Sequence, residues 1–374
     1  MATHEIKPQQ IEPLLEGMAI LGTGGGGAPG WGKAIMENDF AKGRNYKIVD
    51  PEDIPDGATV VSGGIMGSVK EIDHMNFKDL LNYWEDNYEL ERAFEEMEKE
   101  LGRKIDYIVP FEMGGLNTPA ILSLGARKNI PIVNGDALGR AAPETQMTVF
   151  TGHGISVTPM PLVDHKGNVI VVRKADDPTY PDQIGRWMVT RGGHLGANNH
   201  YPMSGKECKE SVIPKTITGA IALGEKIIKL RDEGMDPREA IIEVTSGIEL
   251  FSGRIKKMTE SEAEGFYFTK VELEGLDEDK KSSGELIVKN ETMAFWKDNE
   301  IKGIFPDLIC MLEPGTGRGL MSTELSEGLE IHLIGCPCHP RLRKGLDHPW
   351  GKIAFSSKRY GQEIDFIPIE KLNV

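Results

Sequence analysis

The chain has 374 residues, of which 39% are hydrophobic and 27% charged, and its formal net charge at pH 7 is −15. This composition is typical of a globular protein long enough for two domains, and the negative charge argues against nucleic acid or an anionic membrane as the main partner. No apolar run approaches the ~20 residues of a membrane span, and the start lacks the pattern of a signal peptide. The four cysteines are too few for a disulfide scaffold, so we expect a cytoplasmic chain with free thiols.

A glycine-rich turn at residues 21–30 follows a segment with helical spacing at residues 11–20. Turns of this kind can present backbone N–H groups to a phosphate or a carboxylate. A dinucleotide fingerprint needs a strand before the turn, and a P-loop needs a Lys-Ser/Thr pair, so we do not predict a nucleotide site. Gly24 and Gly25 are candidates to contact a polar ligand, and close backbone packing against a neighbouring turn explains them equally well.

Two segments after this turn, residues 46–49 and 59–62, have the apolar and β-branched composition of strands. The second ends in another glycine-rich turn, which makes Gly64 a candidate substrate contact. Residues 89–101 have an amphipathic helical pattern that stops at Gly102. We therefore expect residues 1–160 to form an α/β domain with a mainly parallel sheet.

Residues 105–140 have a strand–helix–strand pattern, and a right-handed crossover would make its two strands parallel. Each strand ends in a turn with a carboxylate, Glu112 after the first strand and Asp136 after the second. Because ligands collect outside the carboxyl ends of such strands, we place the active site there. The neighbouring candidates are Gly114, Gly115, Asn117 and Arg140. A structural ion-pair network of Asp136, Arg140 and Glu144 is the alternative explanation.

From residue 161 onward the pattern changes to strands and turns, interrupted by helical segments. We expect residues 161–374 to form a β-rich domain, sandwich- or barrel-like, with a helical insert at about residues 180–247. The last two strands predicted in this domain are residues 352–357 and 363–369.

Two thiols and an imidazole lie together in the run Cys336-Pro337-Cys338-His339, which is followed by Arg341 and Arg343. Three such groups do not complete a structural zinc site, and a Cys-x-Cys pair is atypical for redox chemistry. We expect one activated thiolate, at Cys338, because His339 and the two arginines would lower the pKa of a nearby thiol. A buried and unreactive cysteine at a strand end is the alternative.

The run GGLNTPAILSLGARKNIPIVNGDALGRAAPETQMTVF, residues 114–150, resembles the signature of the S-methyl-thiohydantoin desulfurase-like family. Similar blocks follow in order along nearly the whole chain, among them residues 21–30, the Asn290-Glu291 pair and residues 305–314. The family has a cysteine at the position of Cys338, followed by an acidic residue where this chain has His339 and by a tryptophan where it has Leu342. The resemblance implies an α/β N-terminal domain, a β-rich C-terminal domain and hydrolytic attack on a five-membered cyclic urea or thiourea derivative.

We therefore expect a hydrolase of hydantoin- or thiohydantoin-like rings, in which a Cys338 thiolate or an activated water attacks the ring carbon. Glu112 or Asp136 would move the proton. The alternative is a non-catalytic ligand-binding subunit of a hydantoinase-type complex. The expected contacts of the small-molecule substrate are Gly24, Gly25, Gly64, Gly114, Gly115, Asn117, Arg140, Asn290, Glu291, His339 and Arg341.

The sequence contains no motif that specifies a cofactor or a protein partner. A divalent metal such as zinc is left open, although the chain has no His-x-His or His-Glu-x-x-His spacing. A homo-oligomer and a hydantoinase-type partner are left open as well.

Overall fold

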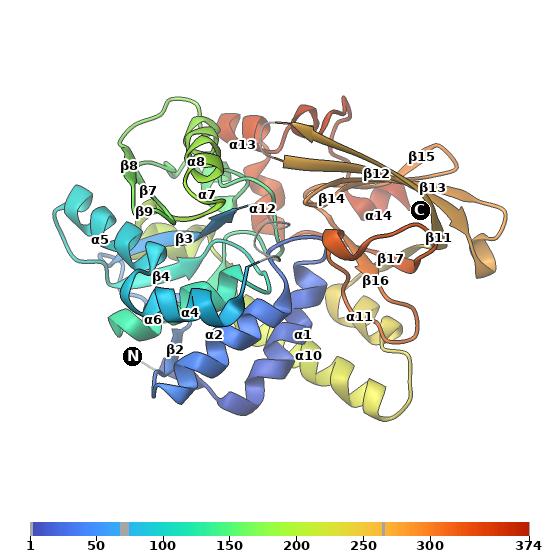
Figure 1. Cartoon of the computed structure of the whole chain (residues 1–374). Coiled ribbons are helices and arrows are strands. Elements are labelled where there is room, and N and C mark those ends of the chain that lie inside the picture. Colours follow the sequence, from blue (N-terminus) through green and yellow to red (C-terminus); the bar gives the residue numbers. More distant parts are fainter. Residues whose placement is uncertain (1–2, 68–74, 264–265, 374) are drawn as a thin grey trace.

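The structure is a computed structural model that describes residues 3–67, 75–263 and 266–373. Figure 1 shows two lobes, an α/β lobe built around one sheet and a second lobe built around an antiparallel sheet. The predicted fold class, an α/β N-terminal domain followed by a β-rich domain, is confirmed. Within the described residues, no helix is long and apolar enough to cross a membrane.

The sheet of the first lobe has a parallel centre. Its strands lie in the order β1 (Thr3–Ile6), β2 (Tyr46–Val49), β5 (Ile132–Val133), β4 (Tyr107–Pro110), β3 (Thr59–Gly67), β9 (Leu195–Ser204), β7 (Met160–Asp164) and β8 (Val169–Val172). The neighbours β2, β5, β4 and β3 are parallel, and the strands outside them pair antiparallel. The predicted strand–helix–strand unit is therefore confirmed as β4, α6 (Asn117–Lys128) and β5.

Helices and loops cover both faces of this sheet, because its central strands are apolar on both sides. Ile108 of β4 packs into one core with Ile48 and Val61, whereas its neighbour Val109 packs into a second core on the other face. The helices of the first core are amphipathic or wholly buried, and α5 ends at Gly102 in the left-handed conformation, as predicted. The first core is built from α1 (Ile11–Leu21), α2 (Pro29–Ala41), α4 (Phe77–Asp86), α5 (Glu89–Leu101), α6 and the start of α10 (Thr216–Asp232).

The second core also contains residues from the far end of the chain, which join the two lobes. Leu342 of α12 (Pro340–Gly345) and Ala354 of α13 (Pro349–Ala354) pack there with Val109 and Val133. In Figure 1 these helices lie between the lobes. The other α-helices of the described residues are α7 (Val149–Gly152), α8 (Tyr180–Arg191), α9 (Gly205–Ser211), α11 (Arg238–Thr245) and α14 (Ile369–Leu372). The short strand β6 (Gly135–Asp136) pairs with β10 (Ile213–Pro214).

The second sheet is antiparallel throughout. Its order is β15 (Glu300–Ile304), β14 (Glu291–Lys297), β13 (Ser283–Lys289), β12 (Phe266–Gly275), β11 (Ile248–Ala263), β17 (Glu330–Cys336) and β16 (Leu308–Leu312). The two strands predicted at residues 352–357 and 363–369 are wrong, because the first region contains the end of α13 and the second is irregular up to α14. His348 caps α13 and Pro349 opens it, a combination that favours a helix.

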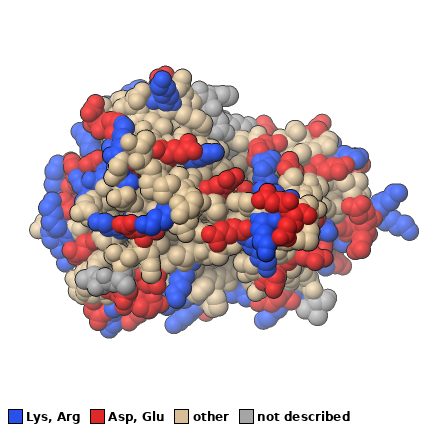
Figure 2. Space-filling view, turned by 90° about the horizontal axis from the view of Figure 1, so that it is seen from below, with Lys and Arg blue, Asp and Glu red and all other residues tan. Residues whose placement is uncertain are grey.

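The segment after residue 160 contributes to both lobes. β7, β8 and β9 extend the first sheet, and α8 to α11 account for the helices predicted at residues 180–247. On the face seen from below in Figure 2, Lys and Arg side chains of the described residues are interspersed with Asp and Glu. Charges of both signs are therefore present on that face despite the net charge of −15.

Candidate active site

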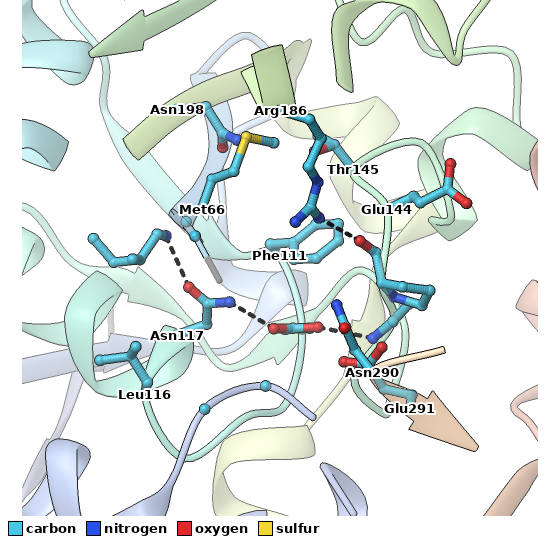
Figure 3. A pocket seen from close by; sticks show the side chains of 18 of the residues that line it. Met66, Phe111, Leu116, Asn117, Glu144, Thr145, Arg186, Asn198, Asn290 and Glu291 are labelled. Atoms are coloured by element: carbon cyan, nitrogen blue, oxygen red, sulfur yellow. Dashed lines mark hydrogen bonds between the residues drawn. The ribbon is translucent and has the colours of Figure 1, made fainter. Parts of the chain in front are cut away.

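A cavity of about 70 Å³ lies outside the carboxyl ends of β3 and β4, where the sequence predicts a site. Its walls come from both lobes (Figure 3). The first lobe contributes the glycine loop after α1, the end of β3, the turn after β4 and the start of α6, and the turn between β13 and β14 closes the cavity from the second lobe. The residues that define its chemistry are Glu112, Asn117, Arg186, Asn198, His200 and Glu291.

Glu112 is buried in the turn after β4 with only 2% of its surface exposed. The side-chain amide of Asn117 donates to Oε1 at 2.6 Å, and the Ala142 N–H donates to Oε2 at 2.8 Å. Asn117 is itself fixed, because its Oδ1 accepts from the Ile65 N–H at 2.8 Å. Burial raises the pKa of Glu112, although the two donors favour its ionised form.

Glu291 is the second carboxylate of the cavity and opens β14. The residue before it, Asn290, has a left-handed backbone (φ 58°) that turns the chain between β13 and β14. Glu291 is 3% exposed, and its Oε2 has no hydrogen-bond partner among the described residues. Burial, and next the negative charge of Glu112, raise the pKa of Glu291. This carboxyl group therefore holds a proton more readily than Glu112 does.

The glycine loop after α1 has room for these carboxylates because it lacks side chains. A Cβ at Gly25 would lie 1.8 Å from Oε1 of Glu291, and a Cβ at Gly26 would lie 3.6 Å from Oε1 of Glu112. The two carboxylates thus face consecutive residues of one loop. Gly64 and Asn290 line the same cavity.

The other predicted glycines serve packing. A Cβ on Gly114 or on Gly115 would lie 2.6 Å from a backbone atom of the glycine loop. The Gly24 N–H donates to Leu320 O, and Gly24 O accepts from the Ser322 N–H. Their small size lets two turns and the second lobe approach closely.

Besides Glu144 and Thr145, three polar residues of the cavity were not predicted as site residues from the sequence. Asn198 and His200 come from β9, which pairs with β3 in the register Gly64↔Asn198 and Ser62↔His200. Neither Oδ1 of Asn198 nor Nδ1 of His200 has a partner among the described residues, and burial lowers the pKa of His200 to about 3. The imidazole is therefore neutral at physiological pH. The third residue, Arg186, reaches the cavity from α8.

Asp136 and Arg140 are buried beside the cavity and have structural partners. The Asp136 carboxylate accepts from the N–H groups of Leu138 and Gly139, and burial raises its pKa to about 7. Arg140 donates to main-chain oxygens of the second lobe, including Asp307 O at 2.8 Å, which ties the lobes together. Asp136, Arg140 and Glu144 do not form the ion-pair network considered as the alternative, because Glu144 pairs with Lys289 and Arg359.

Cys338, His339 and Arg140 line a different cavity of about 320 Å³, together with Cys336. The predicted lowering of the Cys338 pKa is wrong: burial, and next the Asp307 carboxylate, raise the pKa of this thiol. Arg343 does lower the pKa of Cys338, but by less than burial and Asp307 raise it, and the other expected activating groups are engaged elsewhere. Arg343 pairs with Asp307 and Glu370, Arg341 donates to Val212 O, and the His339 ring caps α12. The structure thus brings Glu112, Asn117, Asn290 and Glu291 together and places Cys338, His339 and Arg341 apart from them.

Within the part of the chain that the structure describes, no group of three or more His, Cys, Asp or Glu side chains is arranged to hold a metal ion. The candidate site contains three carboxylates, of Glu112, Glu144 and Glu291, together with one guanidinium, one imidazole and several amide groups.

Comparison with known proteins gives a family and a fold. The S-Me-THD-like N-terminal domain matches residues 9–174, and the S-Me-THD-like C-terminal domain matches residues 176–369. No curated protein sequence matches the chain significantly. A crystal structure of a protein from Chromobacterium violaceum, solved by the Northeast Structural Genomics Consortium, superposes with a TM-score of 0.74 at 23% identity, covering 98% of this chain and 100% of that chain. At this identity the similarity shows the fold alone.

Proposed function

Because this chain belongs to the S-Me-THD-like family over almost its whole length, we propose that it hydrolyses a small cyclic urea or thiourea derivative, with S-methyl-thiohydantoin as the reference substrate. The family name supports the class of ring. The observation that carries the proposal is the pair of buried carboxylates, Glu112 and Glu291, that face one glycine loop in a cavity at the strand ends. We assign the reaction to this pair and to an activated water, and leave Cys338 out of the chemistry.

Two buried carboxyl groups that repel each other do not both ionise near neutral pH, so the pair shares one proton. The two donors on Glu112 favour its charged form, and the unpaired oxygen of Glu291 favours the protonated form there. Glu112 is then the general base and Glu291 the general acid.

The proposed reaction has two steps. Glu112 takes one proton from water as the oxygen bonds to the ring carbon that carries the S-methyl group, and Glu291 gives its proton to the adjacent ring nitrogen. In the second step Glu291 takes the proton of the new hydroxyl group, the carbon–sulfur bond breaks, and Glu112 gives its proton to the departing sulfur. The products are a hydantoin and methanethiol, and the pair again holds one proton.

The pH dependence of kcat should be bell-shaped. Below the raised pKa values both carboxyl groups are protonated and the base is lost, and above them both are ionised and the acid is lost. The acidic limb should lie above the ordinary Glu pKa of about 4.3. Methanethiol release between pH 4 and pH 10 measures the profile. A rate that keeps rising to pH 10 would instead indicate a thiolate nucleophile, since the Cys338 pKa is raised.

Cys338→Ser should keep kcat within about fivefold of the wild type, because a serine hydroxyl can replace a buried thiol that takes no part in the reaction. The same hydroxyl could not replace a nucleophilic thiolate. The assay is methanethiol release from S-methyl-thiohydantoin, with Cys336→Ser as the matched variant in the same cavity. A loss of ~1,000-fold or more in Cys338→Ser alone would restore the covalent route.

A further inference from the structure

The cavity of the proposed hydrolase contains one cation that the reaction above does not use. Of the described residues that line it, Arg186 is the only Lys or Arg. Glu144 lines the cavity too, but Lys289 and Arg359 neutralise its carboxylate. In Figure 3 the Arg186 side chain points from α8 toward the Phe111 ring. Asn290 and Glu291 lie below that ring in this view. An anion held by Arg186 would therefore lie in the same cavity as the carboxylate pair.

The guanidinium of Arg186 has donors to spare. One terminal nitrogen donates to Pro143 O at 2.5 Å and the buried Nε faces Asp182, whereas the second terminal nitrogen donates to none of the described residues. Asp182 forms an ion pair with Arg186 through Nε at 3.5 Å, and its other oxygen accepts from both the N–H and the hydroxyl group of Thr145. Asp182 also does not line the cavity. Arg186 is held in place by these contacts and by the Phe266 ring, 4.3 Å away.

The rest of the cavity suits a small, flat, polar ring. Phe111, Met66 and Leu116 supply apolar walls, and Oδ1 of Asn198 is an unpaired acceptor for a ring N–H. A guanidinium with free donors binds a planar carboxylate through two parallel hydrogen bonds. We propose that the substrate is a ring with a carboxylate-bearing substituent, as in a ring derived from an acidic amino acid, and that Arg186 binds this carboxylate. This inference rests on the proposed function for the identity of the ring.

The binding test uses two stable hydantoins, hydantoin-5-acetic acid and its primary amide, and isothermal titration calorimetry at pH 7.5. The wild type should bind the acid ~100-fold more tightly than the amide, because only the acid forms charge-assisted bonds with Arg186. In Arg186→Gln this ratio should fall to within about threefold. The matched control is Arg191→Gln, because Arg191 lies on the same helix with its guanidinium over the Trp187 ring. This variant should keep the wild-type ratio of affinities for the acid and the amide.

Equal binding of the acid and the amide by the wild type would by itself overturn the inference, because this comparison does not depend on whether a variant folds. An unchanged ratio in Arg186→Gln overturns it as well. If that variant does not fold, Arg186→Lys replaces it. The ratio should then fall about tenfold, because an ammonium group keeps the charge but cannot bind both carboxylate oxygens through two parallel hydrogen bonds. Retention of the full ratio in Arg186→Lys would overturn the assignment of a two-bond carboxylate contact.

Methanethiol release from the S-methyl-thio forms of both rings, measured in parallel, separates this inference from the proposed function. A preference for the acid in binding without any turnover would leave the inference standing and contradict the hydrolase. Turnover of both rings with no preference for the acid would support the hydrolase and contradict the role of Arg186.

Discussion

Replacing Glu291 by Gln should lower kcat for methanethiol release by ~100-fold or more, which is the scale of a lost general acid. The amide keeps the shape of the side chain but cannot give a proton to the ring nitrogen. Glu112→Gln should cause a loss of similar size, because it removes the base. Glu300→Gln is the matched control, since Glu300 is an exposed residue of the same lobe, 77% accessible at its side chain. Wild-type turnover in Glu291→Gln would contradict the mechanism.

The same variant should be more stable than the wild type at alkaline pH. The folded pKa of Glu291 is raised, so its protonated form is favoured in the native state. The stability associated with that proton is complete below the unfolded pKa of about 4.3 and is lost as the pH rises through the higher folded value. Glutamine cannot ionise, so the melting temperature of Glu291→Gln should exceed that of the wild type at pH 9 and match it more closely at pH 5. If the melting-temperature advantage of Glu291→Gln instead became smaller as the pH rises, the raised pKa of Glu291 would be contradicted.

Gly25→Ala should abolish most turnover, again by ~100-fold or more, while the protein stays folded. The new Cβ would lie 1.8 Å from Oε1 of Glu291, so the carboxylate must move out of its position. Gly25 is not among the glycines with positive φ, and all three atoms nearest to the new Cβ belong to the Glu291 side chain rather than to backbone, so we expect that side chain to move and the fold to tolerate the methyl group.

Gly30→Ala is the control for this prediction, because nothing lies within 4 Å of a Cβ at that position of the same glycine-rich segment. Circular dichroism and the melting temperature establish the fold of both variants, and methanethiol release gives their activity. A fully active Gly25→Ala would show that the position of the Glu291 carboxylate is unimportant for the reaction.

The sequence predicts the parts of this site that lie within one local unit. The apolar run before Glu112, the helix from Asn117 and the next strand follow from composition and periodicity, and the parallel crossover follows from chirality. Chain order therefore places Glu112 and Asn117 at the carboxyl end of a strand. The Asn290-Glu291 pair was predicted from the family resemblance alone, since a hairpin turn in another lobe gives no local sign of where it docks.

Long-range pairing explains what the sequence analysis missed. Asn198 and His200 look like polar residues of a loop, and only the pairing of β9 with β3 brings them to the cavity. Arg186 lies on a helix where a solvated cation is the ordinary expectation. Cys338 shows the opposite error: its neighbours in sequence are cationic, but the fold places it against Asp307, a residue of another loop whose carboxylate accepts from the Cys338 N–H.

The most direct test of the central claim is a crystal structure of Glu291→Gln with S-methyl-thiohydantoin bound, since this variant should bind the ring without consuming it. We expect electron density for the ring in the cavity lined by Gly26, Phe111 and Asn198, with the ring carbon that carries the S-methyl group facing Glu112. Density for the ring in the other cavity, against Cys336 and Cys338, would contradict the assignment of the active site.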